Sequence, residues 1–137
     1  MSEFTHLHLH TEYSLLDGAC DVYKLVDLVA KLGQKSVAMT DHGNIYGAVH
    51  FFNAAKEKGI KPILGCELYV CKAEDHRADT PNDKYNHLLV LAETGKAIGI
   101  LSALPPKPAC TAFTDTPASA RITLLNIRKG SSVSPAA

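Results

Sequence analysis

The first ten residues of the sequence carry three histidines at every second position. His6, His8 and His10 stand in the stretch FTHLHLH, and an acidic residue, Asp17, follows in the next segment. In an extended strand, residues two apart point to the same face, with Cα atoms about 7 Å apart. Two imidazoles on one face can bind one divalent metal ion or two neighbouring ions, and a nearby carboxylate can add an oxygen ligand and negative charge. The spacing therefore predicts a metal site at His8, His10 and Asp17.

Three more candidate ligands stand where later strands are expected to begin or end. His42 lies in DHGN after an apolar stretch, Glu67 lies in GCE, and His87 opens another apolar stretch. In folds built from parallel strands with helical crossovers, functional residues gather at the carboxyl ends of the strands. Imidazole and carboxylate ligands without thiolate suit zinc, manganese or iron, and differ from a closed structural zinc site. The predicted metal ligands are His8, His10, Asp17, His42, Glu67 and His87.

Each candidate also has a plainer interpretation. His6 only starts the alternating row, and we expect His50 on a helix and His76 in a polar segment to be exposed bystanders. The segment TDHGN alone could be a turn closed by an aspartate side chain, and Glu67 alone could be a charge at a rim. The recurrence of histidine or acid at four successive strand ends favours the metal site.

The elements that must position these residues alternate between strand and helix. CDVYKLVDLVAKLG predicts a helix, with Asp21 as N-cap and Gly33 at its end, and YGAVHFFNAAKEKG predicts a second helix closed by a glycine. The first helix carries an apolar stripe of Val22, Leu25, Val26, Leu28, Val29 and Leu32. FTHLHLH, KSVAMT, KPILG, ELYVC and YNHLLVLAE predict strands, and KAEDHRADTPNDK predicts a polar loop. This order favours parallel strands with helical crossovers, and hence an α/β layer or barrel fold.

Composition limits the classes of function. The chain has 137 residues, 46% of them hydrophobic, with 14 basic and 14 acidic side chains, so we expect one globular domain without a basic field that would recruit nucleic acid. The four cysteines form no C-x-x-C pair, which favours free thiols in a reducing compartment. No signal peptide or long apolar run is present, and a cytoplasmic protein without membrane association is expected.

HLHLHTEYSLLDGA, AMTDHGNIYGAV, GIKPILGCELYV and YNHLLVLAE together resemble the opening of the PHP (polymerase and histidinol phosphatase) domain. The version at the N-terminus of bacterial DNA polymerase III alpha subunits is the most similar. The resemblance implies a distorted (βα)₇ barrel that holds up to three metal ions at its strand ends. It also implies metal-dependent phosphoesterase chemistry, in some polymerases 3′–5′ proofreading, and DNA and other replisome subunits as partners of an intact polymerase. Matched motif by motif, His8 and His10 form the H-x-H pair, and Asp17, His42, Glu67 and His87 take the other ligand positions.

The chain departs from the family pattern after residue 94. The family uses a later histidine and a D-x-H pair, whereas no histidine follows His87, so the metal set is incomplete. Read one base earlier from Ala97 onward, permitted codons spell GYRNLIRLTSEACLHGFYRHPRISK, which contains family-like GFY and PRI segments. We therefore predict a one-base deletion near the codons of Gly95 and Lys96, with a genuine divergent tail as the alternative. On this interpretation, residues 1–94 are the N-terminal part of a PHP domain in an incomplete barrel. Residues 95–137 are an out-of-frame tail, disordered or irregular, in which ASARITLLNIRKG could form a short helix or strand.

Two functions follow from these observations. The first is a fragment of a DNA polymerase III alpha subunit that binds divalent metal and is inactive alone, because the polymerase region and part of the metal site are missing. The second is an independent small PHP-type phosphoesterase, active as an oligomer that completes the site. A metal-free structural remnant is the plainest alternative. Metal analysis combined with a phosphoesterase assay separates the three.

Overall fold

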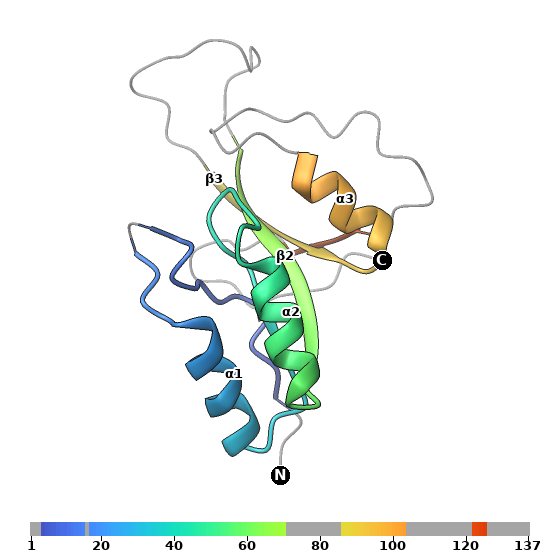
Figure 1. Ribbon diagram of the computed structural model, residues 1–137. Helices are drawn as coiled ribbons and strands as arrows, with labels where there is room; N and C mark the ends of the chain where they lie inside the picture. Colours follow the sequence, from blue (N-terminus) through green and yellow to red (C-terminus); the bar gives the residue numbers. More distant parts are fainter. Residues whose placement is uncertain (1–3, 16, 71–85, 104–121, 126–137) are drawn as a thin grey trace.

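A computed structural model describes residues 4–15, 17–70, 86–103 and 122–125, and shows an α/β fold with helices packed on a four-stranded sheet (Figure 1). The polar loop expected at 72–84, His76 included, lies outside these residues. In chain order the elements are α1 (Val22–Lys31), β1 (Ser36–Met39), α2 (Ala48–Glu57), β2 (Lys61–Val70), β3 (Asn86–Ala92), α3 (Gly95–Ala103) and β4 (Ile122–Leu125).

Local signals set the ends of both predicted helices. The Oδ1 atom of Asp21 accepts a hydrogen bond from the backbone N–H of Lys24 at 2.9 Å, which is the expected N-cap of α1. Gly33 and Gly59 have φ values of 70° and 69° just beyond α1 and α2, where a left-handed residue ends a helix. The predicted apolar stripe is buried only in part, because Leu28 and Leu32 remain 54% and 58% exposed.

The sheet is mixed, and this differs from the all-parallel sheet expected from the sequence. β1 pairs with β2 in parallel, with α2 as the crossover, but β3 pairs antiparallel with β2 and β4 pairs antiparallel with β3. Apolar periodicity marks a strand without encoding its direction, which is why the sequence missed the reversal. KPILG and ELYVC form one continuous ten-residue strand, β2, whose two halves pair with different neighbours.

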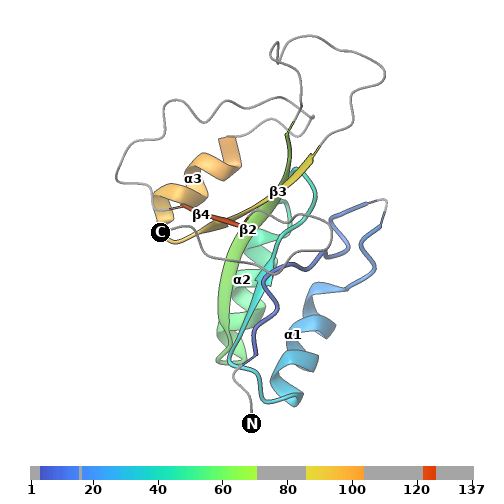
Figure 2. The same cartoon turned by 180° about the vertical axis from the view of Figure 1, so that it is seen from behind.

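The N-terminal segment runs beside β1 without forming a regular strand, contrary to the prediction for FTHLHLH. The amides of Ala38 and Thr40 donate to the carbonyls of His6 and Leu9 at 2.8 and 2.9 Å. The bonded pair on β1 is two residues apart, whereas the pair on the N-terminal segment is three apart. That extra residue is a bulge, which breaks the ladder and redirects the side chains around it. The segment containing His8 therefore follows the edge of β1 as an irregular extended chain (Figure 2).

Two packed regions hold the sheet in place. α1 and α2 bury an apolar cluster against β1 and the first half of β2, in which Met39 and Phe51 are completely buried. Leu101 of α3 packs with Cys66, Leu68 and Val90 over the second half of β2. The second half of β2, which carries Glu67, is therefore fixed from behind by its own core.

Two elements fall in the segment after residue 94, where an irregular tail was expected. α3 contains the apolar residues of GKAIGILSA and buries Ala97 and Leu101 against the sheet, which explains why this part is regular. β4 lies within the stretch for which the sequence allowed a short helix or strand. The rest of that segment lies outside the described residues. Among the residues that are described, no helix is both long enough and apolar enough to cross a membrane.

Candidate metal centre

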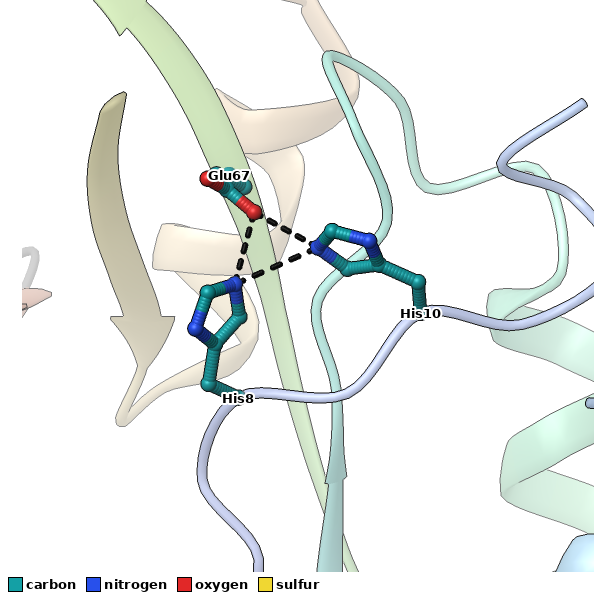
Figure 3. Close-up of side chains that lie close together, drawn as sticks. All are labelled: His8, His10 and Glu67. Carbon is teal, nitrogen blue, oxygen red and sulfur yellow. Dashed lines mark hydrogen bonds and ion pairs between the residues drawn. The ribbon is translucent and has the colours of Figure 1, made fainter. Parts of the chain in front are cut away.

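Glu67 of β2 lies at the centre of a cluster of imidazoles. Its Oε2 atom is 2.7 Å from Nε2 of His8 and 2.6 Å from Nε2 of His10, and its Oε1 atom is 2.5 Å from Nδ1 of His87 (Figure 3 shows His8 and His10). The Glu67 residue is only 3% exposed. A nearly buried carboxylate between three imidazoles must either accept hydrogen bonds from them or share cations with them.

The two histidines of the H-x-H pair converge on one point. Nε2 of His8 and Nε2 of His10 are 3.2 Å apart, and both face the same oxygen of Glu67. The bulged N-terminal segment delivers both rings to this point from one side of β2. Two ring nitrogens and a carboxylate oxygen that all face one position form a donor set that suits a divalent cation.

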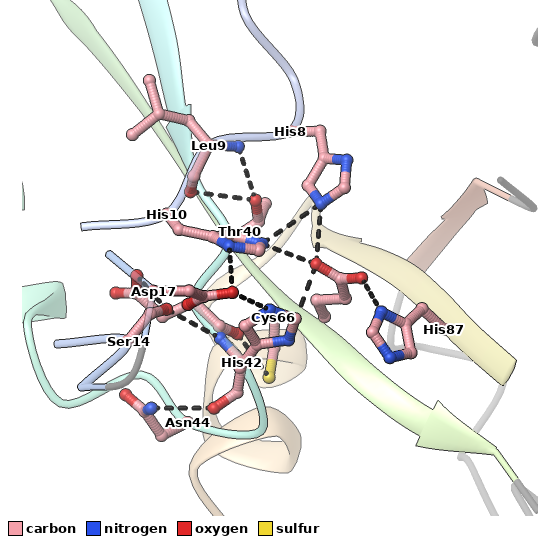
Figure 4. A network of polar contacts seen from close by, with 12 residues as sticks. His8, Leu9, His10, Ser14, Asp17, Thr40, His42, Asn44, Cys66 and His87 are labelled. Atoms are coloured by element: carbon pink, nitrogen blue, oxygen red, sulfur yellow. Dashed lines mark hydrogen bonds and ion pairs between the residues drawn. The ribbon is translucent and has the colours of Figure 1, made fainter. Parts of the chain in front are cut away.

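A second group forms around Asp17. The Oδ2 atom of Asp17 is 3.0 Å from Nε2 of His42 and 3.7 Å from Nδ1 of His10 (Figure 4). Asp17 comes from the turn after the N-terminal segment, and His42 from the loop after β1. The prediction that these three side chains come together is therefore reproduced in the geometry, although their role as ligands stays a prediction.

A third group joins His42, Glu67 and His87. Nδ1 of His42 is 3.8 Å from Oε2 of Glu67, too long for a hydrogen bond, and this buried nitrogen has no hydrogen-bond partner among the described residues. A buried nitrogen without a partner is costly unless something else binds its lone pair. In each of the three groups, one ligand atom per residue lies within 4.8 Å of the others, and His10, His42 and Glu67 are each shared by two groups. The donor set thus fits more than one divalent cation.

Burial and charge oppose each other at the central carboxylate. Burial raises the pKa of Glu67, but hydrogen bonds from His8 and His10 lower it by more, so the pKa lies below its ordinary value. Glu67 is therefore an anion at neutral pH. Its neighbour two residues along β2, Tyr69, has a raised pKa because of burial and the negative charges of Glu67 and Asp17. The Tyr69 ring lies against His42, with ring centres 5.6 Å apart, and against His87 edge-on at 5.0 Å.

Several supporting residues were missed at the sequence level. Thr40 accepts a hydrogen bond from the amide of Leu9 at 2.8 Å through its hydroxyl, which fixes the backbone between His8 and His10. Thr11, Ser14 and Asp41 are buried polar residues bonded to one another, and Tyr69 packs on two of the imidazoles. The only sequence signal for this set was the polar pair Thr40–Asp41 directly after an apolar strand, and we had assigned Asp41 to a turn.

The remaining histidines in the described part of the chain lie apart from the cluster. The exposed ring of His6 packs edge-on against Phe4 with ring centres 4.7 Å apart. His50 on α2 contacts the hydroxyl of Tyr23 through Nδ1 at 3.3 Å and is exposed. Both therefore behave as the bystanders that the plainer interpretation described.

Proteins of known family share this arrangement of sequence. The PHP domain family matches residues 6–124. The DNA polymerase III subunit alpha of Treponema pallidum is 50% identical over 96 residues, which cover 67% of this chain and 8% of the relative. The corresponding subunit of Mycobacterium tuberculosis is 42% identical over 113 residues, covering 71% of this chain and 9% of the relative. The chain thus spans less than a tenth of the length of these relatives.

Solved structures agree on the fold. A candidate metal-dependent phosphoesterase from Bifidobacterium adolescentis is 27% identical with a TM-score of 0.50, over 64% of this chain and 27% of that protein. An amidohydrolase from Chromobacterium violaceum, solved with sulfate and without metal, has a TM-score of 0.51 over 70% of this chain and 31% of that protein, at 23% identity. The second likeness concerns the fold alone. With the family match over most of its length, the chain belongs to the PHP domain family, as its four motifs predicted.

Proposed function

We propose that the cluster around Glu67 binds divalent cations and that the chain is the N-terminal part of the PHP domain of a DNA polymerase III alpha subunit. The observation that carries the metal assignment is the contact of the buried Glu67 carboxylate with His8, His10 and His87, at distances from 2.5 to 2.7 Å. The polymerase assignment is supported by the alpha subunits that are 42–50% identical to this chain. Zinc, manganese and iron all suit these ligands.

When bound, such cations supply Lewis acidity toward a phosphate ester. The chain's own residues supply placement and charge. Glu67 and Asp17 contribute negative charge that balances the cations, while the rigid strand β2 and the bonded N-terminal segment fix the orientation of the imidazoles. Because Asp17 has a side chain 53% exposed, this edge of the cluster is open to a ligand from solvent.

We propose that catalysis is absent in the isolated chain because the ligand set is incomplete. The family resemblance implies a later histidine and a D-x-H pair, and no histidine follows His87. The intact polymerase would act on DNA with other replisome subunits in the bacterial cytoplasm, and we assign no such partner to this chain alone.

The boundary near residue 94 is part of the same proposal. The matched lengths in the Treponema and Mycobacterium relatives correspond to 67% and 71% of this chain, close to the extent of residues 1–94. The family match itself extends to residue 124, past that boundary. Resequencing the gene across the codons of Gly95 and Lys96 tests the deletion. A polymerase reading frame that resumes one base earlier supports it, and an intact frame through the tail refutes it.

One experiment separates the proposed function from its alternative. The purified chain is loaded with zinc or manganese, its metal content is measured by mass spectrometry, and hydrolysis of an aryl phosphate is followed. Bound metal without turnover is the expected result. Stoichiometric metal with turnover would instead support an independent PHP-type phosphoesterase, an alternative favoured by the likeness to the Bifidobacterium protein. A folded chain that takes up neither ion refutes the metal proposal.

A further inference from the structure

A buried polar network lies directly beneath the metal cluster. Thr11 and Asp41 are completely buried and Ser14 is 3% exposed. The carboxylate of Asp41 accepts three hydrogen bonds: from the amide of Thr11 at 2.6 Å, from the Thr11 hydroxyl at 2.8 Å and from the Ser14 hydroxyl at 2.9 Å. A carboxylate without solvent is costly unless such donors satisfy it, so these contacts define one preferred arrangement of the three residues.

The network joins two segments that each carry a candidate ligand. Thr11 directly follows His10, and Asp41 directly precedes His42. The bonds from Thr11 to Asp41 connect residues 30 positions apart in the sequence. The network therefore fixes the backbone at His10 relative to the backbone at His42.

Ser14 extends this connection to the turn that carries Asp17. Its hydroxyl donates to Asp41 and accepts from the amide of His42 at 3.1 Å. Its carbonyl accepts from the amides of Asp17 and Gly18, at 3.1 and 2.7 Å. The turn is closely packed, since a Cβ on Gly18 would lie 1.8 Å from the carbonyl oxygen of Thr11. Ser14 is thus bonded to the backbone of both His42 and Asp17.

We propose that Ser14, held by Asp41, is a positioning residue that sets the Asp17 carboxylate against His42 and so creates the cation site formed by His10, Asp17 and His42. Asp17 needs this support because its side chain is 53% exposed and stands on a turn. The contact that depends on the network is the 3.0 Å approach of Asp17 Oδ2 to His42 Nε2. This inference rests on the proposed metal-binding function, but its geometric part can be measured without metal.

The first test is a metal titration of the full chain with the Ser14→Ala variant, which removes the hydroxyl and leaves the bonds from Thr11 to Asp41. The matched control is Ser102→Ala on α3, where the hydroxyl donates to the carbonyl of Gly99 on an exposed surface far along the chain. Manganese affinity is measured by calorimetry, and cobalt absorption reports the ligand geometry. We expect Ser14→Ala to weaken binding about 10-fold or more, as loss of a residue that orients a ligand does, and the control to leave it unchanged.

A double-mutant cycle distinguishes positioning from a general loss of structure. In an Asp17→Asn background, Ser14→Ala should cause little further loss of affinity, because the ligand that it positions is already gone. In a His8→Ala background its effect should persist in full. Equal effects of Ser14→Ala in both backgrounds, or no effect on the parent chain, would overturn the inference.

The second test uses nuclear magnetic resonance of the His42 ring without metal. Asp17→Asn should shift the ring resonances in the parent chain, and should shift them much less once Ser14→Ala is present. If Ser14→Ala prevents folding, Asp41→Asn, which keeps the size of the side chain, replaces it in both tests. A parent chain that fails to bind metal refutes the proposed function, whereas an unchanged Asp17 effect on the His42 ring refutes the positioning role itself.

Discussion

Glu67 and His10 lie 57 residues apart in the sequence, and their side chains meet with 2.6 Å between Oε2 and Nε2. Glu67 stands in the middle of β2, a strand paired on both sides, whereas His10 stands on an irregular segment that only follows the edge of the sheet. The contact therefore joins the least regular part of the fold to one of its most constrained residues. Because Glu67 also belongs to two of the three candidate ligand groups, we expect the site to depend on it more than on any single histidine.

Glu67→Gln should weaken zinc and manganese binding by about 100-fold or more, since even residues that only orient a ligand cost 10- to 100-fold. The amide keeps the shape of the side chain but removes the negative charge that offsets the cations. Metal content after dialysis and calorimetric affinity check this result. Glu57→Gln, on the exposed surface of α2, is the matched control. Equal metal affinity in the two variants would contradict the central role of Glu67.

The alternating histidine row should divide into residues that bind and one that does not. His10→Ala should reduce metal affinity strongly, because Nε2 of His10 contacts both Glu67 and His8. His6→Ala should leave it unchanged, since its exposed ring packs against Phe4 instead. Parallel titrations of the two variants with cobalt, read by absorption, measure the difference. A loss of affinity in His6→Ala comparable to that in His10→Ala would show that the row acts as one unit.

Features encoded by neighbouring residues could be predicted from the sequence. The N-cap at Asp21 and the glycine ends at Gly33 and Gly59 depend on contacts within a few residues, and α1 and α2 lie within the predicted segments. The six candidate ligands could also be predicted, because histidine and acid at strand ends are unusual enough to stand out. The structure places all of them in one cluster.

Features that depend on distant parts of the chain could not be predicted. The direction of β3 is set by which edge of β2 it meets, and periodicity is the same for either direction. The bulge beside β1 arises from hydrogen bonds between His6 and Ala38, far apart in sequence. Asp41 is indistinguishable from a turn residue until the donors on Thr11 and Ser14 are seen to surround it.

Phe51→Ala should lower the free energy of unfolding by about 3–5 kcal/mol, because it leaves a cavity in the cluster between α1, α2 and the sheet. Its ring is completely buried, whereas the adjacent Phe52 is 41% exposed and lies beneath the Lys56 ammonium. Phe52→Ala should therefore cost less than about 1 kcal/mol. Urea denaturation followed by circular dichroism measures both variants, and similar losses would show that the helices do not bury the face described above.

Cys66 should resist alkylation in the native chain although it directly precedes the central carboxylate. Burial, reinforced by the charge of Asp41, raises the pKa of the Cys66 thiol to about 12. At pH 8 only about 1 thiol in 10,000 would then be ionised, and the thiolate is the form that reacts and that binds metals. The sulfur is further held by its hydrogen bond to the carbonyl of Asp41 at 3.5 Å. Cys66 is therefore expected to stay outside the ligand set, in keeping with a site of imidazoles and carboxylates.

Iodoacetamide labelling at pH 8, with modified peptides identified by mass spectrometry, compares Cys66 with the exposed Cys20 in the same sample. Cys20 should be modified under native conditions, and Cys66 only after urea unfolds the chain. Addition of zinc should leave the native pattern of Cys66 unchanged, because its protection comes from burial and not from coordination. Native labelling of Cys66 at the rate of Cys20 would mean that the second half of β2 opens readily, and a strand that opens readily could not hold Glu67 as a fixed centre for the cluster.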